Sequence, residues 1–323
     1  MDRFSEEVRT LRSDRERVRE QLFSAIIAEL PQGAGMFPRD SNKVSHELID
    51  ALTYIFLTSS RTATLPESTL HTLRAWALDL RRYGFPPTAY AVFARLIRQV
   101  LSAGIEARFV LEDAAAEMAR TAHAADVEGV PAAAAARVTA VRPEGGIHVV
   151  RLEAGFPLGY RPGQFMPVLQ VGRQGVWRNL APALPANPFS QLEFHVTCEI
   201  EVQVGDYVTL GAARGMWPSF ARSELSVTAV GSGTAAAKAI VFHALEMPQP
   251  PRVRLALLGE VAQRSTFERL AAVCEWFSIV ETPSTSGEVV YCGPEADIAA
   301  LNPPPGVLRV CPDAPEKWSV PAS

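Results

Sequence analysis

The most reactive side chains of this chain are its four cysteines, and their spacing argues against a metal or redox centre. They are Cys198, Cys274, Cys292 and Cys311. No two of them are close enough to form the Cys-x-x-Cys pairs of zinc sites and thiol oxidoreductases. We therefore expect reduced thiols, no metal site and no catalytic nucleophile.

A second feature that could carry chemistry is the polar segment SSRTATLPEST (59–69). It lies between two predicted helices, so a protein kinase should reach Thr62 and Thr64, which have Arg61 beside them. Phosphorylation would add nearly two negative charges and create a docking site for a phosphothreonine-binding domain. The alternative is an unmodified solvated loop, which is the commoner role of such a segment.

Composition indicates a soluble globular protein of two or three domains. Of the 323 residues, 48% are hydrophobic and 20% are charged. The formal net charge is -4 and the pI is about 5.9, so nucleic acid is not expected as a partner. The N-terminus lacks a signal-peptide core and no apolar run could span a bilayer, which predicts a cytoplasmic protein that is not transmembrane.

The elements that must position any site begin with helices over residues 1–128. Apolar residues recur at helical spacing from Val8 to Leu30. Further helices are predicted over 46–57, 70–83, 88–101 and 111–124. In WALDLRRYGFPPTAY (76–90), a glycine followed by two prolines separates two of them. Short connections predict one compact all-α domain.

After a small-residue linker over 129–136, the pattern changes from helical to alternating. Short strands separated by Pro/Gly turns over 137–224 predict an antiparallel β-barrel. Over 225–323, apolar strands alternate with helical segments, which predicts an α/β domain with a parallel sheet.

Short motifs follow one another along these regions. They are ELPQGAGMFP (29–38), LRRYGFPPTAY (80–90), GYRPGQFMPV (159–168, with Gly163 and Gln164), VGDYVTLGAARG (204–215), GSGTAAAK (231–238) and VVYCGPE (289–295). Their order resembles the flavohaemoglobins, in which a globin domain precedes a ferredoxin-reductase-like module with FAD-binding and NAD(P)-binding halves. The resemblance is nearly end to end and implies the same three-part architecture.

At the haem site, the resemblance places the family's iron-ligating histidine at Leu80 and its oxygen-stabilising tyrosine at Phe23. Leucine has no lone pair for iron, and phenylalanine lacks the hydroxyl. The alternative ligand His71 lies about two and a half helical turns away and would point elsewhere. We therefore expect haem to be absent.

At the flavin site, the resemblance implies that Arg178 is kept for the pyrophosphate. Leu180 and Ala181 replace the tyrosine and serine that meet the flavin ring, and Trp318 is a candidate to fill the ring pocket. The family's phosphate-binding segment before Gly205 is expected to be deleted.

In the nucleotide half, Gly233 and Thr234 match the family motif, as do Cys292, Gly293 and Pro294. Lys238 stands where the family has a proline, and we expect it to be solvated at a helix start. Cys292 is expected to be a buried structural cysteine. These matches are interpreted as vestigial cofactor-binding positions, so binding of FAD and of NAD(P) is doubtful.

The combined losses predict a haem-less pseudoenzyme that acts as a regulatory or scaffold protein under threonine phosphorylation. Its expected partners are a kinase and a phosphothreonine-binding domain. Association of the chain into a homo-oligomer is a further option that the sequence leaves undecided. The alternative is an FAD-dependent NAD(P)H oxidoreductase with a haem-free globin-like domain. A nitric oxide dioxygenase is a third option, which Leu80 disfavours.

Overall fold

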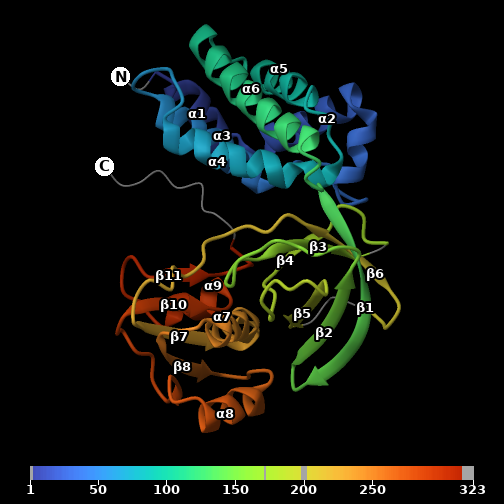
Figure 1. The fold of residues 1–323 in the computed structure, drawn as a ribbon. Coiled ribbons are helices and arrows are strands. Elements are labelled where there is room, and N and C mark those ends of the chain that lie inside the picture. Colours follow the sequence, from blue (N-terminus) through green and yellow to red (C-terminus); the bar gives the residue numbers. More distant parts are fainter. Residues whose placement is uncertain (1–2, 171, 198–201, 315–323) are drawn as a thin grey trace. The chain divides into compact units, whose positions relative to one another are not determined.

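The computed structural model describes residues 3–170, 172–197 and 202–314, and their contacts divide them into two compact units. The first unit contains the helical region up to Ala133, and the second contains the two sheets (Figure 1). No helix among the described residues is long and apolar enough to cross a membrane.

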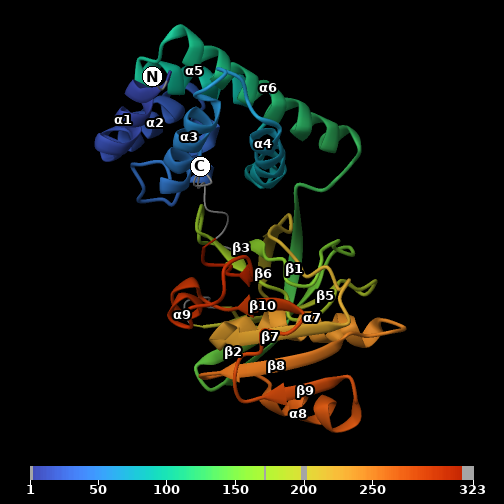
Figure 2. The same ribbon diagram turned by 90° about the vertical axis from the view of Figure 1, so that its left-hand side faces the viewer.

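The first unit is all-α, as the helical periodicity predicts. Its helices are α1 (Ser5–Ser13), α2 (Arg15–Glu29), α3 (His46–Ser59), α4 (Glu67–Leu80), α5 (Ala89–Leu101) and α6 (Ile105–Val127), with 3-10 turns at Pro31–Met36 and Arg81–Tyr83. The long helix α6 packs along α4 and α5 (Figures 1 and 2). Buried leucines and phenylalanines from all six helices, such as Leu11, Leu22, Phe56, Leu73, Leu96 and Leu111, form one core.

Two breaks in this unit follow from local chemistry. The run expected to be one helix from Val8 to Leu30 is divided at Asp14, where the backbone leaves the helical region. Just before the break, the hydroxyl of Ser13 donates to the carbonyl of Arg9 at 2.8 Å, an arrangement that bends helices. Gly84, at φ +73°, then allows the turn that ends the segment after α4.

The first sheet of the second unit is antiparallel and curls into a half-barrel. Its strands are β1 (Ala133–Glu144), β2 (Ile147–Ala154), β3 (Met166–Gln170), β4 (Trp177–Leu180), β5 (Gln191–Val196) and β6 (Tyr207–Gly211), in the order β4-β3-β6-β1-β2-β5. The alanine run expected to be linker enters β1 from Ala133 onward. Apolar side chains on one face of β1 and β2 pack into the half-barrel core.

The second sheet is parallel, in the order β11-β10-β7-β8-β9. Its elements are β7 (Glu224–Val230), a 3-10 turn (Gly231–Gly233), α7 (Thr234–Glu246), β8 (Arg252–Leu258), α8 (Arg264–Val273), β9 (Phe277–Val280), β10 (Glu288–Cys292), α9 (Glu295–Ala300) and β11 (Leu308–Val310). Figure 2 shows β7 between β8 and β10, so the direction in which strands are added reverses beside β7. The carboxyl ends of strands at such a reversal are where open α/β sheets form their ligand clefts.

Candidate functional site

A cleft of about 450 Å³ lies at this reversal point of the second unit. The turn after β7 contributes Ser232 and Gly233, and the turn after β10 contributes Pro294. The half-barrel supplies the opposite wall from β4 and β5, including Arg178 and His195. The cleft therefore brings together the glycine-rich turn, the Cys-Gly-Pro segment and the strand that carries Arg178.

The β4 wall places a cation in a cleft that also receives the start of a helix. Arg178 and Leu180 are half-buried in β4, and Ala181 follows at 7% exposure. Helix α7 begins at Thr234, immediately after Gly233. The free N–H groups of a first helical turn, together with an arginine, are suited to hold phosphate groups.

Gly233 is a glycine for a steric reason. A Cβ atom at this position would overlap the backbone carbonyl of Cys292, so the turn after β7 and the end of β10 can approach only without a side chain. The Cys292 side chain is fully buried and does not line the cleft. Burial, and the nearby thiol of Cys311, raise the pKa of Cys292, so its thiol stays protonated. Gly293 follows Cys292 and packs against the backbone of Val230.

Gly163 and Gln164 do not line the cleft; they form a turn. Gly163 has φ +98°, and the side-chain amide of Gln164 donates to the carbonyl of Gly215 at 3.1 Å. The side-chain oxygen of Gln164 also accepts from the backbone N–H of Arg161 at 2.8 Å. Their observed contacts hold the start of β3 against the connection after β6.

Beside the cleft lies a buried polar network that the sequence analysis missed. The ammonium of Lys238 donates to one carboxylate oxygen of Glu193 and to the side-chain oxygen of Gln263, both at 2.6 Å. The side-chain amide of Gln263 donates to the same Glu193 oxygen at 3.0 Å, and Arg151 donates to the other at 2.9 Å. Lys238 is 4% exposed, so the expectation of a solvated lysine is wrong.

His195 connects this network to the glycine-rich turn. One ring nitrogen lies 3.3 Å from Glu193, and the other lies 2.9 Å from the hydroxyl of Thr234. That hydroxyl donates to the carbonyl of Gly231 at 3.0 Å, and Thr234 is fully buried. Thr234 therefore joins the turn to the half-barrel.

Burial and hydrogen bonding act in opposite directions on these groups. Burial raises the pKa of Glu193, but hydrogen bonds from His195, Lys238 and Arg151 outweigh it and hold that pKa below its usual value. Burial lowers the pKa of Lys238 and the pKa of His195 more than their contacts with Glu193 raise them. The ionised carboxylate is thus the group that the network stabilises.

The helical unit contains its own cavity, of about 440 Å³ and with a mainly apolar lining. Leu80 lines it, together with the aromatic residues Trp76, Tyr83 and Tyr90. Phe23 does not line it, and its ring packs edge-on against Phe37 at a centroid distance of 5.0 Å.

Side chains with lone pairs also border this cavity. They include Met36, Tyr83, Tyr90 and Met118, and also Ser41, Ser45 and Glu47. Tyr90 is held by the core, since its hydroxyl donates to the carbonyl of Ala77 at 3.3 Å. Burial raises the pKa of Tyr90 and that of Tyr83, so both hydroxyls stay protonated at neutral pH. None of the described histidines lines the cavity.

Thr62 and Thr64 are exposed in the connection between α3 and α4. The hydroxyl of Thr64 donates to that of Thr62 at 2.8 Å, and Ala63 between them has φ +55°. Trp318 and Cys198 lie outside the described residues.

Comparison with known structures shows a shared fold. A flavohemoglobin from Malassezia yamatoensis, solved with bound FAD and heme, matches 92% of this chain and 94% of its own, at 12% identity and a TM-score of 0.69. The FAD/NAD-binding domain of the nitric oxide dioxygenase of Vibrio cholerae matches 52% of this chain and 90% of its own, at 15% identity and a TM-score of 0.42. No protein-family model matches the sequence, and no curated protein does so either. The chain therefore has the flavohaemoglobin fold, as its motif order indicates.

This finding corrects the cofactor expectation. We expected haem to be absent and FAD and NAD(P) binding to be doubtful, whereas a structure with this fold holds both FAD and heme. The expectation rested on single positions such as Leu80, Leu180 and Ala181. These substitutions leave open cavities in both units, and none of them fills its cavity.

The residues that line the cleft and the helical cavity fit parts of a dinucleotide cofactor and of a haem, respectively. Arg178 and the first turn of α7 suit the phosphates of a dinucleotide, and the apolar walls of the helical cavity suit the body of a tetrapyrrole. The side chain of Leu80 does not fit the iron, because it offers no ligand atom. Leu180 and Ala181, which line the same cleft, offer aliphatic side chains without a hydrogen-bonding group.

Proposed function

We propose that this chain is a cytoplasmic regulatory or scaffold protein built on the flavohaemoglobin fold, controlled by phosphorylation of Thr62 or Thr64. The observation that carries the proposal is that the charged groups beside the cleft bond to one another. Lys238 donates to Glu193, and the His195 ring lies between Glu193 and Thr234, within hydrogen-bonding distance of both. These groups serve to hold the half-barrel against the parallel sheet, so they are not free to relay protons for a reductase.

The connection between α3 and α4 supports the phosphorylation part of the proposal. Both threonines are exposed, and their hydroxyls bond to each other or to a backbone carbonyl of the same turn. A kinase would therefore displace no core contact. A phosphate here would offer three acceptor oxygens to the arginines of a phosphothreonine-binding domain.

A second candidate is an FAD-dependent NAD(P)H oxidoreductase, and the open cleft at the strand-order reversal favours it. If the cofactors of the Malassezia protein are carried over to this chain, FAD would lie against Arg178 and the tetrapyrrole against Leu80. When bound, a flavin supplies hydride and single-electron chemistry.

Turnover of the loaded protein separates the two candidates. The purified chain is incubated with FAD and haemin, freed of excess, and assayed for oxidation of NADH and NADPH. We expect no rate above that of free FAD at the same concentration. Sustained turnover that an Arg178→Ala variant loses would reject the regulatory proposal in favour of the oxidoreductase.

Phosphopeptide mapping tests the modification separately. The chain is isolated from cells in which its threonine kinases are active, and peptides that cover residues 59–69 are analysed by mass spectrometry. We expect phosphate on Thr62 or Thr64. Complete recovery of the unmodified peptide would count against this part of the proposal.

A further inference from the structure

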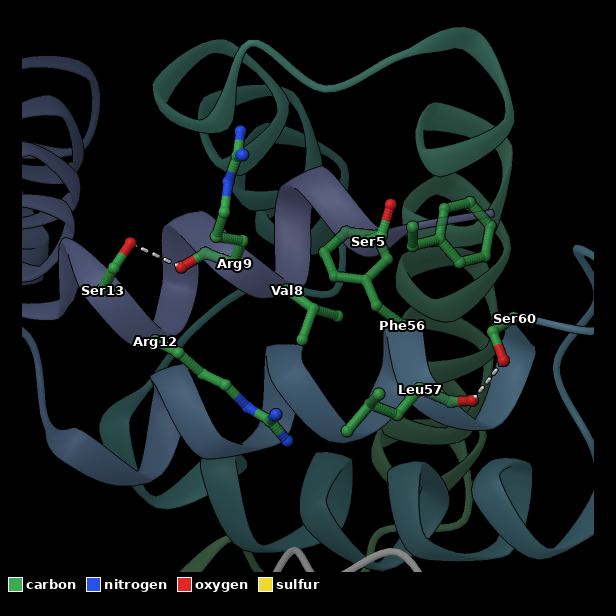
Figure 3. A pocket seen from close by; sticks show the side chains of 9 residues that line it. Ser5, Val8, Arg9, Arg12, Ser13, Phe56, Leu57 and Ser60 are labelled. Atoms are coloured by element: carbon green, nitrogen blue, oxygen red, sulfur yellow. Dashed lines mark hydrogen bonds between the residues drawn. The ribbon is translucent and has the colours of Figure 1, made fainter. Parts of the chain in front are cut away.

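A second pocket of the helical unit, of about 520 Å³, lies between α1 and α3 (Figure 3). Its lining is mostly apolar, and its residues are Phe4, Ser5, Val8, Arg9, Arg12, Ser13, Phe56, Leu57 and Ser60. The rings of Phe4 and Phe56 pack 5.4 Å apart at its base and are nearly fully buried. The base is therefore part of the hydrophobic core, and Val8 and Leu57 lie beside it (Figure 3).

The charge at this pocket has a single sign. Arg9 and Arg12 extend from α1 in different directions, while Ser5, Ser13 and Ser60 supply the other polar groups (Figure 3). None of the nine lining residues is acidic. Arg12 has no ion pair or hydrogen bond of its side chain within the described part of the chain, and Arg9 comes no nearer than 3.8 Å to Glu6, with both side chains largely exposed.

These features select one class of partner. A membrane surface would need a larger group of cations and large exposed apolar side chains, whereas this pocket has two arginines and buried rings. Nucleic acid is disfavoured by the net charge of -4. An amphipathic segment with an apolar anchor and flanking carboxylates matches both the apolar base and the positive rim.

We propose that the pocket between α1 and α3 docks an acidic amphipathic helix of a protein partner. A leucine-sized side chain enters beside Val8 and Leu57, and carboxylates of the partner pair with Arg9 and Arg12. The inference rests on the proposed regulatory function, because it names the chemistry of a partner. It needs no phosphate on the protein, so it can fail while the phosphorylation proposal holds, and the reverse.

The test is direct binding of a synthetic probe to the unphosphorylated full chain. The probe is a fluorescein-labelled peptide of about 16 residues, long enough to form a helix. It carries leucines three and four residues apart on one face and glutamates elsewhere, and a second peptide carries lysines in place of the glutamates. Binding is followed by fluorescence anisotropy, and hydrogen exchange of the complex locates the site.

Charge reversal gives the decisive comparison. Arg9→Glu combined with Arg12→Glu should weaken binding by about tenfold or more, since two exposed ion pairs become repulsive. The matched control is Arg39→Glu, which reverses another exposed arginine of the same unit that lines neither this pocket nor the cavity bordered by Leu80. We expect the control to bind as the wild-type chain does, and the lysine peptide to bind at least about tenfold more weakly than the acidic one.

Several results would overturn the proposal. These are no binding of the acidic peptide, equal binding of the lysine peptide, or equal effects of the double reversal and the Arg39→Glu control. Protection from exchange outside α1 and α3 would also reject it. Both arginines are exposed, so the reversed variant should keep the wild-type thermal unfolding temperature, and this measurement shows that any loss of binding is local.

Discussion

Replacing Lys238 by methionine should strongly destabilise the second unit. Methionine keeps the length of the side chain but removes the ammonium, which donates at 2.6 Å to both Glu193 and Gln263. The Gln263 side-chain oxygen would lose its one donor among the described residues, at a cost of about 1–3 kcal/mol. Glu193 would stay charged and buried with its three other donors.

The expected loss for Lys238→Met is about 3 kcal/mol. Removing one partner of a buried ion pair typically costs about 3–5 kcal/mol, and the remaining bonds from His195, Gln263 and Arg151 place this case at the lower end. Glu193→Gln in the same chain should recover part of the loss, because it removes the buried charge that has lost its ammonium partner. The two substitutions should therefore couple by about 1–3 kcal/mol.

The assay must report on the second unit alone, because a chain of two units need not unfold in one step. Hydrogen exchange of peptides covering β5 and α7 gives the opening free energy at the network itself. Lys43→Met is the control, since Lys43 lies in the other unit and pairs with Glu16 and Glu20 at the surface. A loss below about 1 kcal/mol for Lys238→Met, or strict additivity in the double variant, would refute the assigned role of the network.

Three further outcomes are expected. Because burial lowers the pKa of His195, the unfolded state binds more protons than the folded state below about pH 6.5, so the unfolding free energy should fall as the pH drops through this range. Urea titrations of a His195→Asn variant should show an unfolding free energy that depends less on pH, and an equal pH dependence of variant and wild type would contradict this. Phosphothreonine incorporated at Thr62 should weaken binding of the acidic peptide in the anisotropy assay, because the phosphate would repel the peptide's carboxylates. Thr62 follows the lining residue Ser60 by two positions, within about 7 Å of chain, and unchanged binding would show that a charge in this loop does not act on the pocket. Gly233→Ala should destabilise the second unit by about 1–3 kcal/mol in thermal unfolding, because its new Cβ atom would overlap the backbone of Cys292. Gly35→Ala should be nearly neutral, because a Cβ atom at Gly35 meets open space. Similar values for both variants would show that the turn after β7 can move to make room.

The order of elements could be predicted from the sequence because each element has a clear hydrophobic period. The prolines after Gly84 and the alternation in β2 each mark their element locally. The helical, antiparallel and parallel regions were therefore identified correctly. The division of the first helix at Asp14 was missed, because the apolar spacing continues across it.

The buried network could not be predicted, because its residues look like those of a solvated surface. In β5, Leu192 and Phe194 face the half-barrel core, so the alternating Glu193 and His195 are expected to face water. Helix α7 covers that face and brings Lys238 onto it. This burial depends on how two segments that are distant in the sequence pack together. The sequence alone shows only that Glu193 and His195 alternate with apolar residues along β5.

The cofactor expectation failed for a related reason. A substitution such as Leu80 shows which chemical group is missing, but it does not show whether neighbouring side chains close the space. In this structure, the side chains around Leu80 leave a cavity of about 440 Å³ unfilled. Single positions can therefore identify an absent ligand atom, while the capacity of the fold to hold a molecule depends on the whole lining.

The network of Glu193 and Lys238 also limits how the protein can be dissected. Its donors and acceptors come from β2, β5, α7 and the segment after β8, so any cut between the half-barrel and the parallel sheet would separate charges that are buried together. A fragment ending at residue 224 would keep the Glu193 carboxylate and lose its lysine, and a fragment beginning there would do the opposite. Truncation, circular permutation or fusion should leave these two sheets in one polypeptide, with their joint boundary near Ala133 as the place to cut.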